Sequence, residues 1–197
     1  VNCIELNKEL MDLQELRSVQ KDLELNLHAK QCRAKLLNGK ALDYTKKQID
    51  FIKKQLIALD KEIEQIISNN KTMNDKQKIL ISYPGIGKKI ANGLIAELPE
   101  LGSLNKKEIA SLVGVAPKTN ESGKKANKAH ISGGRFFIRK ALYMAALVAA
   151  YYNDKMKHKY KEFIEKGKAA KIALTAIMRK IIVCLNAMIK NNKFYVI

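Results

Sequence analysis

An apolar stripe between residues 49 and 66 constrains the fold more than any other feature of the chain. Its members alternate in steps of three and four, with charged and amide residues between them, and they are Ile49, Ile52, Leu56, Leu59, Ile63 and Ile66. This spacing is typical of a helix that buries one seam against a partner helix, as in a coiled coil. The stripe therefore predicts a long helix and a second helix that covers it.

A less regular stripe upstream supplies the second helix. It consists of Leu6, Leu10, Leu13, Leu16, Val19, Leu23 and Leu27. The sequence NGK at positions 38–40 separates the two stripes, so we predict an antiparallel helical hairpin, a coiled coil, over residues 1–70. Helices of about 30 residues would be about 45 Å long. A seam of this kind also favours a homo-oligomer, and a simple spacer is the alternative.

Shorter helical patterns, broken by glycine and proline, follow over residues 71–197. Asn105 with Glu108 predicts a capping box at the start of a helix that ends at Gly114. Further helices are expected at 136–152, which should be well buried, and at 168–189. The inner face of the last helix is expected to hold Ile172, Ala176, Ile182, Leu185 and Ile189. Because no stretch shows a convincing strand alternation, the predicted fold class is all-α, a hairpin plus a compact helical domain.

The charge is distributed unevenly along the chain. The formal net charge is +18, of which residues 1–70 carry +1 and residues 71–197 carry +17. Such an asymmetry indicates a surface that meets a polyanion, of which nucleic acid is the commonest. A general lysine bias in the composition is the alternative, but the balanced first segment disfavours it.

Composition also excludes several classes of protein. The cysteines, Cys3, Cys32 and Cys184, form no close pair and no metal-ligand spacing, so neither a disulfide framework nor a metal site is expected. The longest apolar stretch noted, residues 141–152, is too short to span a bilayer, and no leader pattern precedes the first helix. We therefore expect a protein that does not enter the membrane and acts in the cytoplasm.

A glycine-containing turn at residues 84–89 resembles the centre of a helix-hairpin-helix motif. Gly85 and Gly87 would let the backbone turn at positive φ and approach a phosphate at a helix N-terminus, where Lys88 and Lys89 add positive charge. Contacts of this kind position a duplex without reading its bases. The alternative is a tight turn between helices in which Ile86 fills the core.

A polar segment, residues 118–134, is predicted to be a long exposed loop. Ser122 precedes Gly123, which would let a phosphate approach, and Lys124 and Lys125 follow directly. A serine hydroxyl becomes a useful nucleophile only when it is aligned and the developing charge is stabilised. From these residues alone an ordinary solvated serine is the stronger interpretation, and Ser132 competes as a nucleophile. The histidines lie at no triad-like spacing, so a hydrolase triad is not expected.

Three stretches together are similar to a known family. They are LISYPGIGKKIANGLIAELPELGSLNKKEIASLVGVAPKTNESGKK, then HISGGRFFIRKALYMAALVAA, then KEFIEKGKAAKIALTAIMRKIIVCLNAMIK. In this order they resemble the C-terminal part of the DEDD transposases of the insertion-sequence one-ten family, the bridge-RNA-guided recombinases. The resemblance covers roughly residues 76–190, and the preceding coiled coil fits the same architecture.

The resemblance implies roles for individual residues. It implies that Ser122, followed by Gly123, is a nucleophile that forms a transient ester with DNA, and that Arg139 belongs to the catalytic site. Lys124, Lys125, Lys128 and Arg135 would then contact nucleic acid. The chain departs from the family at HISGG, where Ser132 stands in place of the usual lysine.

The resemblance further implies an N-terminal RuvC-like domain whose four acids bind divalent metal, expected to be Mg²⁺, and a guide RNA as a second partner. The acid pattern of that domain is not in these 197 residues, so we expect no cofactor on this chain itself and no strand transfer by this chain alone. The predicted function is that of a DNA transposase or recombinase acting through a serine–DNA ester. A non-catalytic helix-hairpin-helix DNA-binding or scaffold module is the alternative, and a purely structural helical arm is a third interpretation.

Overall fold

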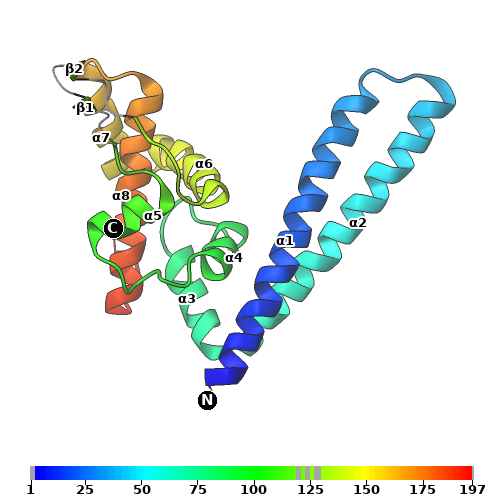
Figure 1. The fold of residues 1–197 in the computed structure, drawn as a ribbon, viewed down its shortest axis with the longest axis horizontal. Helices are drawn as coiled ribbons and strands as arrows, with labels where there is room; N and C mark the ends of the chain where they lie inside the picture. The colour runs from blue at the N-terminus through cyan, green and yellow to red at the C-terminus, as the bar shows by residue number, and fades with distance from the viewer. Residues whose placement is uncertain (1–2, 119–120, 123–124, 127–129, 197) are drawn as a thin grey trace. The chain divides into compact units, whose positions relative to one another are not determined.

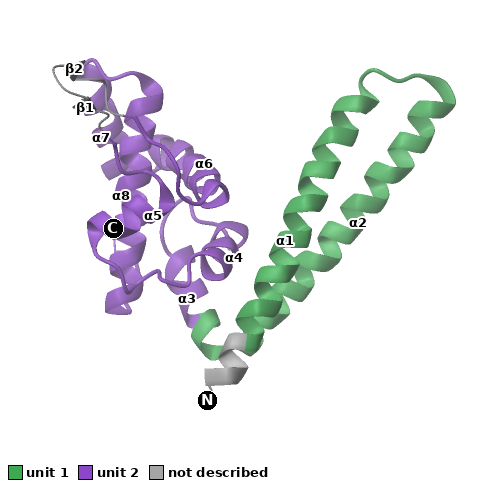
Figure 2. Cartoon of the chain, in the orientation of Figure 1, with its two compact units in different colours: residues 1–74 green, residues 75–197 purple. Residues whose placement is uncertain are grey.

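The structure is a computed structural model that describes residues 3–118, 121–122, 125–126 and 130–196, with side chains described for residues 8–118 and 130–196. Within these ranges the chain forms eight helices and one pair of two-residue strands (Figure 1). The prediction of an all-α fold is confirmed. The chain divides into two compact units, residues 1–74 and residues 75–197 (Figure 2).

The first unit is a hairpin of two long helices, α1 (Cys3–Ala34) and α2 (Gly39–Asn69), which run side by side (Figure 1). The predicted stripe lies on the face of α2 that packs against α1, so its apolar side chains are shielded from solvent. Ile49, Ile52 and Ile63 are buried, while Leu56 and Leu59 are half-buried. The long antiparallel hairpin predicted from the spacing is confirmed, and its seam is filled within one chain.

A polar contact interrupts this seam. Gln20 of α1 is 1% exposed, and its amide donates a hydrogen bond to the carboxylate of Asp60 on α2. The guanidinium of Arg17 donates in turn to the amide oxygen of Gln20. Because a buried polar group must keep its partner, such a contact favours one alignment of the two helices over shifted ones.

The second unit packs its helices around one long apolar helix, α8 (Ala170–Asn191). The end of α3 (Lys71–Ile81) leads into the unit, and α4 (Lys88–Glu97), α5 (Lys106–Val113), α6 (Phe136–Tyr152) and α7 (Asp154–Glu165) follow. α8 packs against α5, α6 and α7, and α6 also packs against α4. The facing residues of α6 are mostly alanines, so α6 and α8 can approach closely.

Local signals placed several helix ends correctly. The Asn105 side chain accepts hydrogen bonds from the backbone of Lys107 and Glu108, and the Glu108 carboxylate accepts one from the Asn105 backbone, which completes the predicted capping box. The helix then ends at Gly114 in the left-handed conformation. The helix predicted at 136–152 has those bounds as α6.

Three expectations are corrected. α6 is buried along one face only, because Phe136, Met144, Tyr151 and Tyr152 are more than half exposed. Ile172, expected on the inner face of the last helix, is 58% exposed, and Ala173 and Leu174 are buried beside it, whereas Ile182 and Leu185 of the same predicted face are buried. The segment predicted to be a loop contains a short antiparallel ribbon, β1 (Glu121–Ser122) and β2 (Lys125–Ala126).

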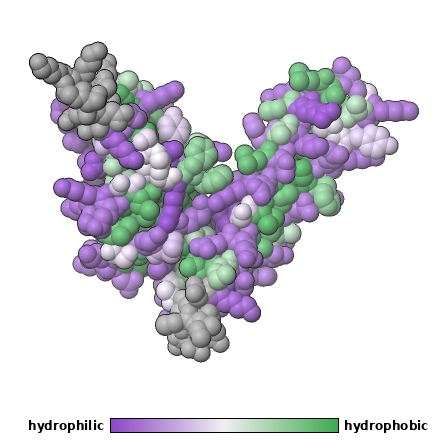
Figure 3. Space-filling view, in the orientation of Figure 1, coloured by the Kyte–Doolittle hydropathy of each residue, from purple (hydrophilic) through white to green (hydrophobic). Residues whose placement is uncertain are grey.

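By length and composition, α8 is the one helix of the described residues that could cross a bilayer. It is a longer apolar segment than the stretch at 141–152 that the sequence suggested. Half of its most apolar window is buried within the protein, as expected of a helix at the centre of a helical core. The face drawn in Figure 3 is largely hydrophilic, with hydrophobic side chains scattered over both units.

Candidate functional site

The turn between α3 and α4 combines a tight reverse turn with a buried plug. The backbone N–H of Ile86 donates to the carbonyl of Tyr83 at 3.0 Å, with Pro84 and Gly85 at the two central positions and Gly85 at φ +96°. Proline followed by glycine is the sequence preferred in a type II turn. A Cβ at Gly85 would meet the Ala145 carbonyl of α6, so the turn lies directly on that helix.

The turn has a buried part at Ile86 and an exposed part that begins at Gly87. Ile86 is 3% exposed, as the core-filling interpretation predicted. Gly87, Lys88 and Lys89 are exposed at the N-terminus of α4, and the N-cap residue Gly87 makes no side-chain hydrogen bond to the helix. Gly87 has φ −87°, so the predicted positive φ is found at Gly85 and is wrong for Gly87. The geometry is compatible with a phosphate at this N-terminus, and the contact itself stays a prediction.

The C-terminal segment after α8 braces the same turn. The Tyr195 ring packs edge-on against the Tyr83 ring with 4.7 Å between centroids, and the Tyr195 backbone N–H donates to the Ser82 hydroxyl at 2.9 Å. Tyr83 is fully buried, and burial raises the pKa of its hydroxyl far above the usual value. Contacts from both sides therefore hold the turn in place on the unit.

The short ribbon carries the predicted nucleophile. Ser122 pairs with Lys125, so the two strands join through the two residues between them. Lys118 and His130 exchange backbone hydrogen bonds of 2.8 and 3.1 Å that close the base of this segment. The side chains of Ser122 and Lys125 are outside the described residues, and so are Gly123, Lys124 and Lys128 altogether. Their predicted roles remain predictions.

Immediately after the ribbon, the chain is locked onto the end of α5. Gly134 has φ +70° and lies so close to Gly114 that a Cβ on either glycine would overlap the backbone around the other. The Arg139 guanidinium donates to the carbonyl of Gly133 and also lies 5.9 Å from the centre of the Phe136 ring. Two stretches that resemble the family, VGVAP and SGG, thus meet beside Arg139.

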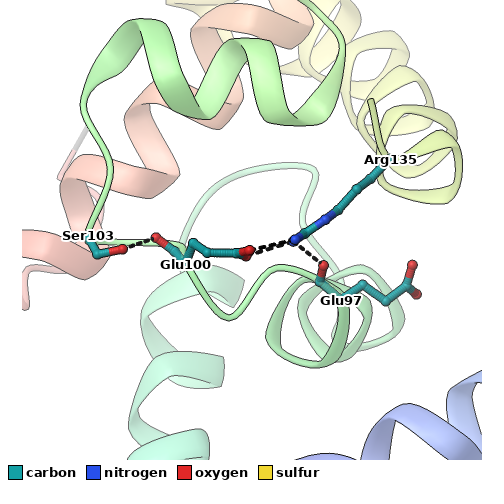
Figure 4. Close-up of polar contacts among 4 residues, drawn as sticks. All are labelled: Glu97, Glu100, Ser103 and Arg135. Atoms are coloured by element: carbon teal, nitrogen blue, oxygen red, sulfur yellow. Dashed lines mark hydrogen bonds and ion pairs between the residues drawn. The ribbon is translucent and has the colours of Figure 1, made fainter. Parts of the chain in front are cut away.

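Arg135 makes its contacts within the protein (Figure 4). Its guanidinium donates two hydrogen bonds to the Glu100 carboxylate, at 2.6 and 2.7 Å, and a third to the carbonyl of Glu97 at the end of α4. The hydrogen bonds from Arg135 lower the pKa of the Glu100 carboxyl. The predicted nucleic-acid contact of Arg135 is not tested, but the geometry shows that this side chain joins the start of α6 to the α4–α5 connection.

A pocket of about 920 Å³ lies beside Arg139. It is formed by the end of α5, the ribbon base, α6 and α8, and its lining includes His130, Tyr143, Lys168, Lys171, Ile172, Thr175 and Arg179. Lys171, Thr175 and Arg179 recur every four residues along one face of α8, and Lys168 lies just before the helix. The sequence analysis missed these residues, although a lysine and an arginine at helical spacing on a largely apolar helix could have signalled them.

Two other features considered in the sequence analysis are Ser132 and the metal donors. Ser132, the competing nucleophile, is half-buried in the segment between the ribbon and α6. Among the described residues, no group of three or more histidine, cysteine, aspartate or glutamate side chains could hold a metal ion. The resemblance implies the divalent metal on a RuvC-like domain and not on these residues, and this stays a prediction.

Comparison with known proteins bears on the same segment. Residues 77–161 match the family described as Transposase IS116/IS110/IS902 family. This stretch contains the α3–α4 turn, the capped α5, the ribbon, α6 and most of α7, so it includes every predicted site residue.

Two curated relatives extend this match. The chain is 31% identical over 154 residues to the pilin gene-inverting protein of Moraxella bovis and, to the same extent, to that of Moraxella lacunata. The alignments cover 76% of this chain and 48% of each relative, so the chain spans about half the length of the curated relatives it matches. Together these findings support the family predicted from the sequence, since residues 77–161 match its model and the two relatives align over most of this chain.

Proposed function

We propose that residues 71–197 are the DNA-binding and strand-transfer segment of a transposase or site-specific recombinase of this family, with residues 1–70 as its helical hairpin. One observation carries the proposal. The ribbon that holds Ser122 is closed at its base by the Lys118–His130 pair, and the chain that leaves it is locked by Gly134 beside Arg139. A nucleophile on a short projecting ribbon can reach a DNA backbone while its support stays rigid.

In the proposed reaction the Ser122 hydroxyl oxygen attacks a DNA phosphorus atom. A bond from serine oxygen to phosphorus forms, the bond from phosphorus to a deoxyribose oxygen breaks, and that oxygen leaves with the electron pair. Negative charge on the non-bridging oxygens grows in the transition state, and a guanidinium such as that of Arg139 can stabilise it. A second strand reverses these steps and regenerates the serine hydroxyl.

The serine proton needs an acceptor, and we propose that it comes from residues outside this sequence, together with the divalent metal implied by the resemblance. Double-stranded DNA is the proposed substrate, and Lys88, Lys89, Lys124, Lys125 and Lys128 are its proposed backbone contacts. A guide RNA and a homo-oligomer are further proposed partners of the whole protein.

The covalent adduct is the decisive test. The full-length protein that contains this chain is incubated with its DNA, the denatured complex is digested, and the modified peptide is identified by mass spectrometry. We expect the adduct on Ser122, its loss in Ser122→Ala, and its persistence in the matched variant Ser132→Ala. An adduct on Ser132, or adduct formation by Ser122→Ala, would show that the assignment is wrong.

The exposed N-terminus of α4 keeps the non-catalytic interpretation open as a second candidate. In that case Ser122→Ala would leave recombination intact, whereas substitution of Lys88 and Lys89 would abolish DNA binding. Both functions predict weaker DNA binding when Lys88 and Lys89 are substituted, so Ser122→Ala separates them: it abolishes recombination only if Ser122 is the nucleophile.

A further inference from the structure

Apart from Arg139, the proposed strand-transfer chemistry uses none of the residues that line the pocket beside it. We infer that the pocket receives one unstacked nucleotide of the DNA strand, the nucleotide next to the attacked phosphate. The inference rests on the proposed function, since it takes Arg139 to face that phosphate. The pocket volume, about 920 Å³, falls within the range of about 300–1,000 Å³ that small-ligand sites occupy.

The charges around the pocket select an anion. Arg139 comes from α6, Lys168 precedes α8, and Lys171 and Arg179 lie on α8 two and a quarter turns apart. No aspartate or glutamate is among the described residues that line the pocket. Lys168 and Lys171 are exposed, whereas Arg139 and Arg179 are half-buried. A phosphate at the open side would meet the lysines first, and the flanking phosphate would lie near Arg139.

The uncharged residues of the lining favour a nucleotide base in addition to a phosphate. Val115, Pro117 and Ile172 give apolar surface, and the half-buried ring of Tyr143 lies among the lining residues as well. Nucleotide bases stack on aromatic rings without regard to sequence. A base inside a duplex cannot reach such a hollow surface, so the nucleotide must leave the stack to enter it. The combination of cations, apolar surface and one aromatic ring therefore fits a single nucleotide.

The position of the pocket explains why one nucleotide would be taken. His130, which closes the ribbon base through its backbone, also lines the pocket. The ribbon with Ser122 and the pocket thus start from the same short segment. Holding the neighbouring nucleotide out of the stack would bend the strand locally and present the attacked phosphate toward the ribbon.

The test compares a short DNA duplex that carries one extrahelical thymidine with the fully paired duplex and with a duplex carrying an abasic site at that position. Because the extrahelical base needs no unstacking, we expect the whole chain to bind that duplex about tenfold more tightly than the paired one. The abasic duplex should lose most of this preference, since it offers no base. Fluorescence anisotropy measures all three affinities.

Two pairs of variants locate the preference. Tyr143→Ala should reduce it by about tenfold, and Tyr143→Phe, which keeps the ring, should retain it. Lys171→Gln should weaken it, whereas Lys180→Gln, an exposed lysine of the same helix outside the pocket lining, should not. All four variants should still bind the paired duplex, which also shows that they are folded.

Each other outcome is decisive. Equal affinity for extrahelical and paired duplexes would overturn the pocket inference and leave duplex binding and the serine chemistry intact. A preference that survives Tyr143→Ala would place the base elsewhere. A stronger preference for an RNA duplex with an extrahelical uridine would assign the pocket to RNA and overturn its assignment to the DNA strand. Failure to bind any duplex would overturn both the pocket inference and the proposed DNA binding.

Discussion

The helical hairpin and the second unit both bury apolar residues between helices, but they do so in different arrangements. The hairpin buries a repeating seam between two helices, carries almost no net charge over residues 1–70, and uses one buried amide to align its partners. The second unit wraps short capped helices around α8 and carries the excess of positive charge. Because its apolar residues repeat regularly, the hairpin can be predicted from their spacing alone. The fold of the second unit depends instead on close contacts between residues that are far apart in the sequence.

The largest expected difference between the two regions is in the stability lost when a glycine is replaced by alanine. Gly134→Ala should destabilise the second unit by roughly 3 kcal/mol, because the residue has φ +70° and its Cβ would overlap the backbone of Gly114. Gly39→Ala in the hairpin turn, which has φ +56° and open space around it, should cost only about 1 kcal/mol. Thermal unfolding followed by circular dichroism measures both.

Gly87→Ala is the matched control in the second unit, since that residue has φ −87° and open space for a Cβ. Its stability should change by no more than about 0.5 kcal/mol. If Gly134→Ala is as mild as Gly87→Ala, the close approach at Gly114 does not hold the second unit together.

The next effect concerns the division of charge. Replacing Lys88 and Lys89 with glutamine should lower duplex affinity by about tenfold and reduce the slope of log affinity against log salt by about 2, because two phosphate contacts are lost. Replacing Lys53 and Lys54, which are exposed on α2, should change neither. Anisotropy titrations over a range of salt concentrations measure both slopes. Equal losses from the two pairs would mean that charge, rather than location, determines binding.

A smaller effect is expected at the outer face of the hairpin. Because the seam is filled within one chain, self-association would use exposed apolar residues, and Tyr44 and Phe51 lie one heptad apart on α2 with 69% and 61% exposure. Tyr44→Glu with Phe51→Glu should lower the oligomer mass in light scattering without loss of helix content. Lys54→Glu is the control that adds charge alone. A monomeric unmodified chain would refute self-association.

The smallest effect is electrostatic. The Glu100 pKa is lowered by its hydrogen bonds from Arg135, so this pair stabilises the fold above the ordinary carboxyl pKa of about 4.3 and loses that contribution as pH falls through the lowered value. Both side chains are about a third exposed, so Glu100→Gln should cost less than about 1 kcal/mol near pH 7. Urea unfolding should show the difference shrink and then vanish as the pH falls below the lowered pKa of Glu100. A difference that persists there would assign the effect to packing.

Sequence patterns predicted some residues of the candidate site and missed others. The resemblance of short stretches pointed to Ser122 and Arg139 before any geometry was known, and family and relatives match the same segment. The pocket residues on α8 were missed because their meaning depends on α6 and the ribbon base lying opposite them. The hydrogen bonds from Arg135 to Glu100 were missed because the two residues are 35 positions apart in the sequence, and the nucleic-acid contact of Arg135 stays a prediction.

The sequence by itself determined what is local or repeated in this protein. The seam of the hairpin, the capping box at Asn105, the turn at Gly85 and the span of α6 follow from interactions among residues a few positions apart, which side-chain spacing records directly. Tertiary structure alone decided which face of α6 and α8 is buried, where Gly134 meets Gly114, and which cations surround one pocket. These depend on contacts between segments far apart in the chain, whose free energy belongs to the packed arrangement and to no single stretch of residues.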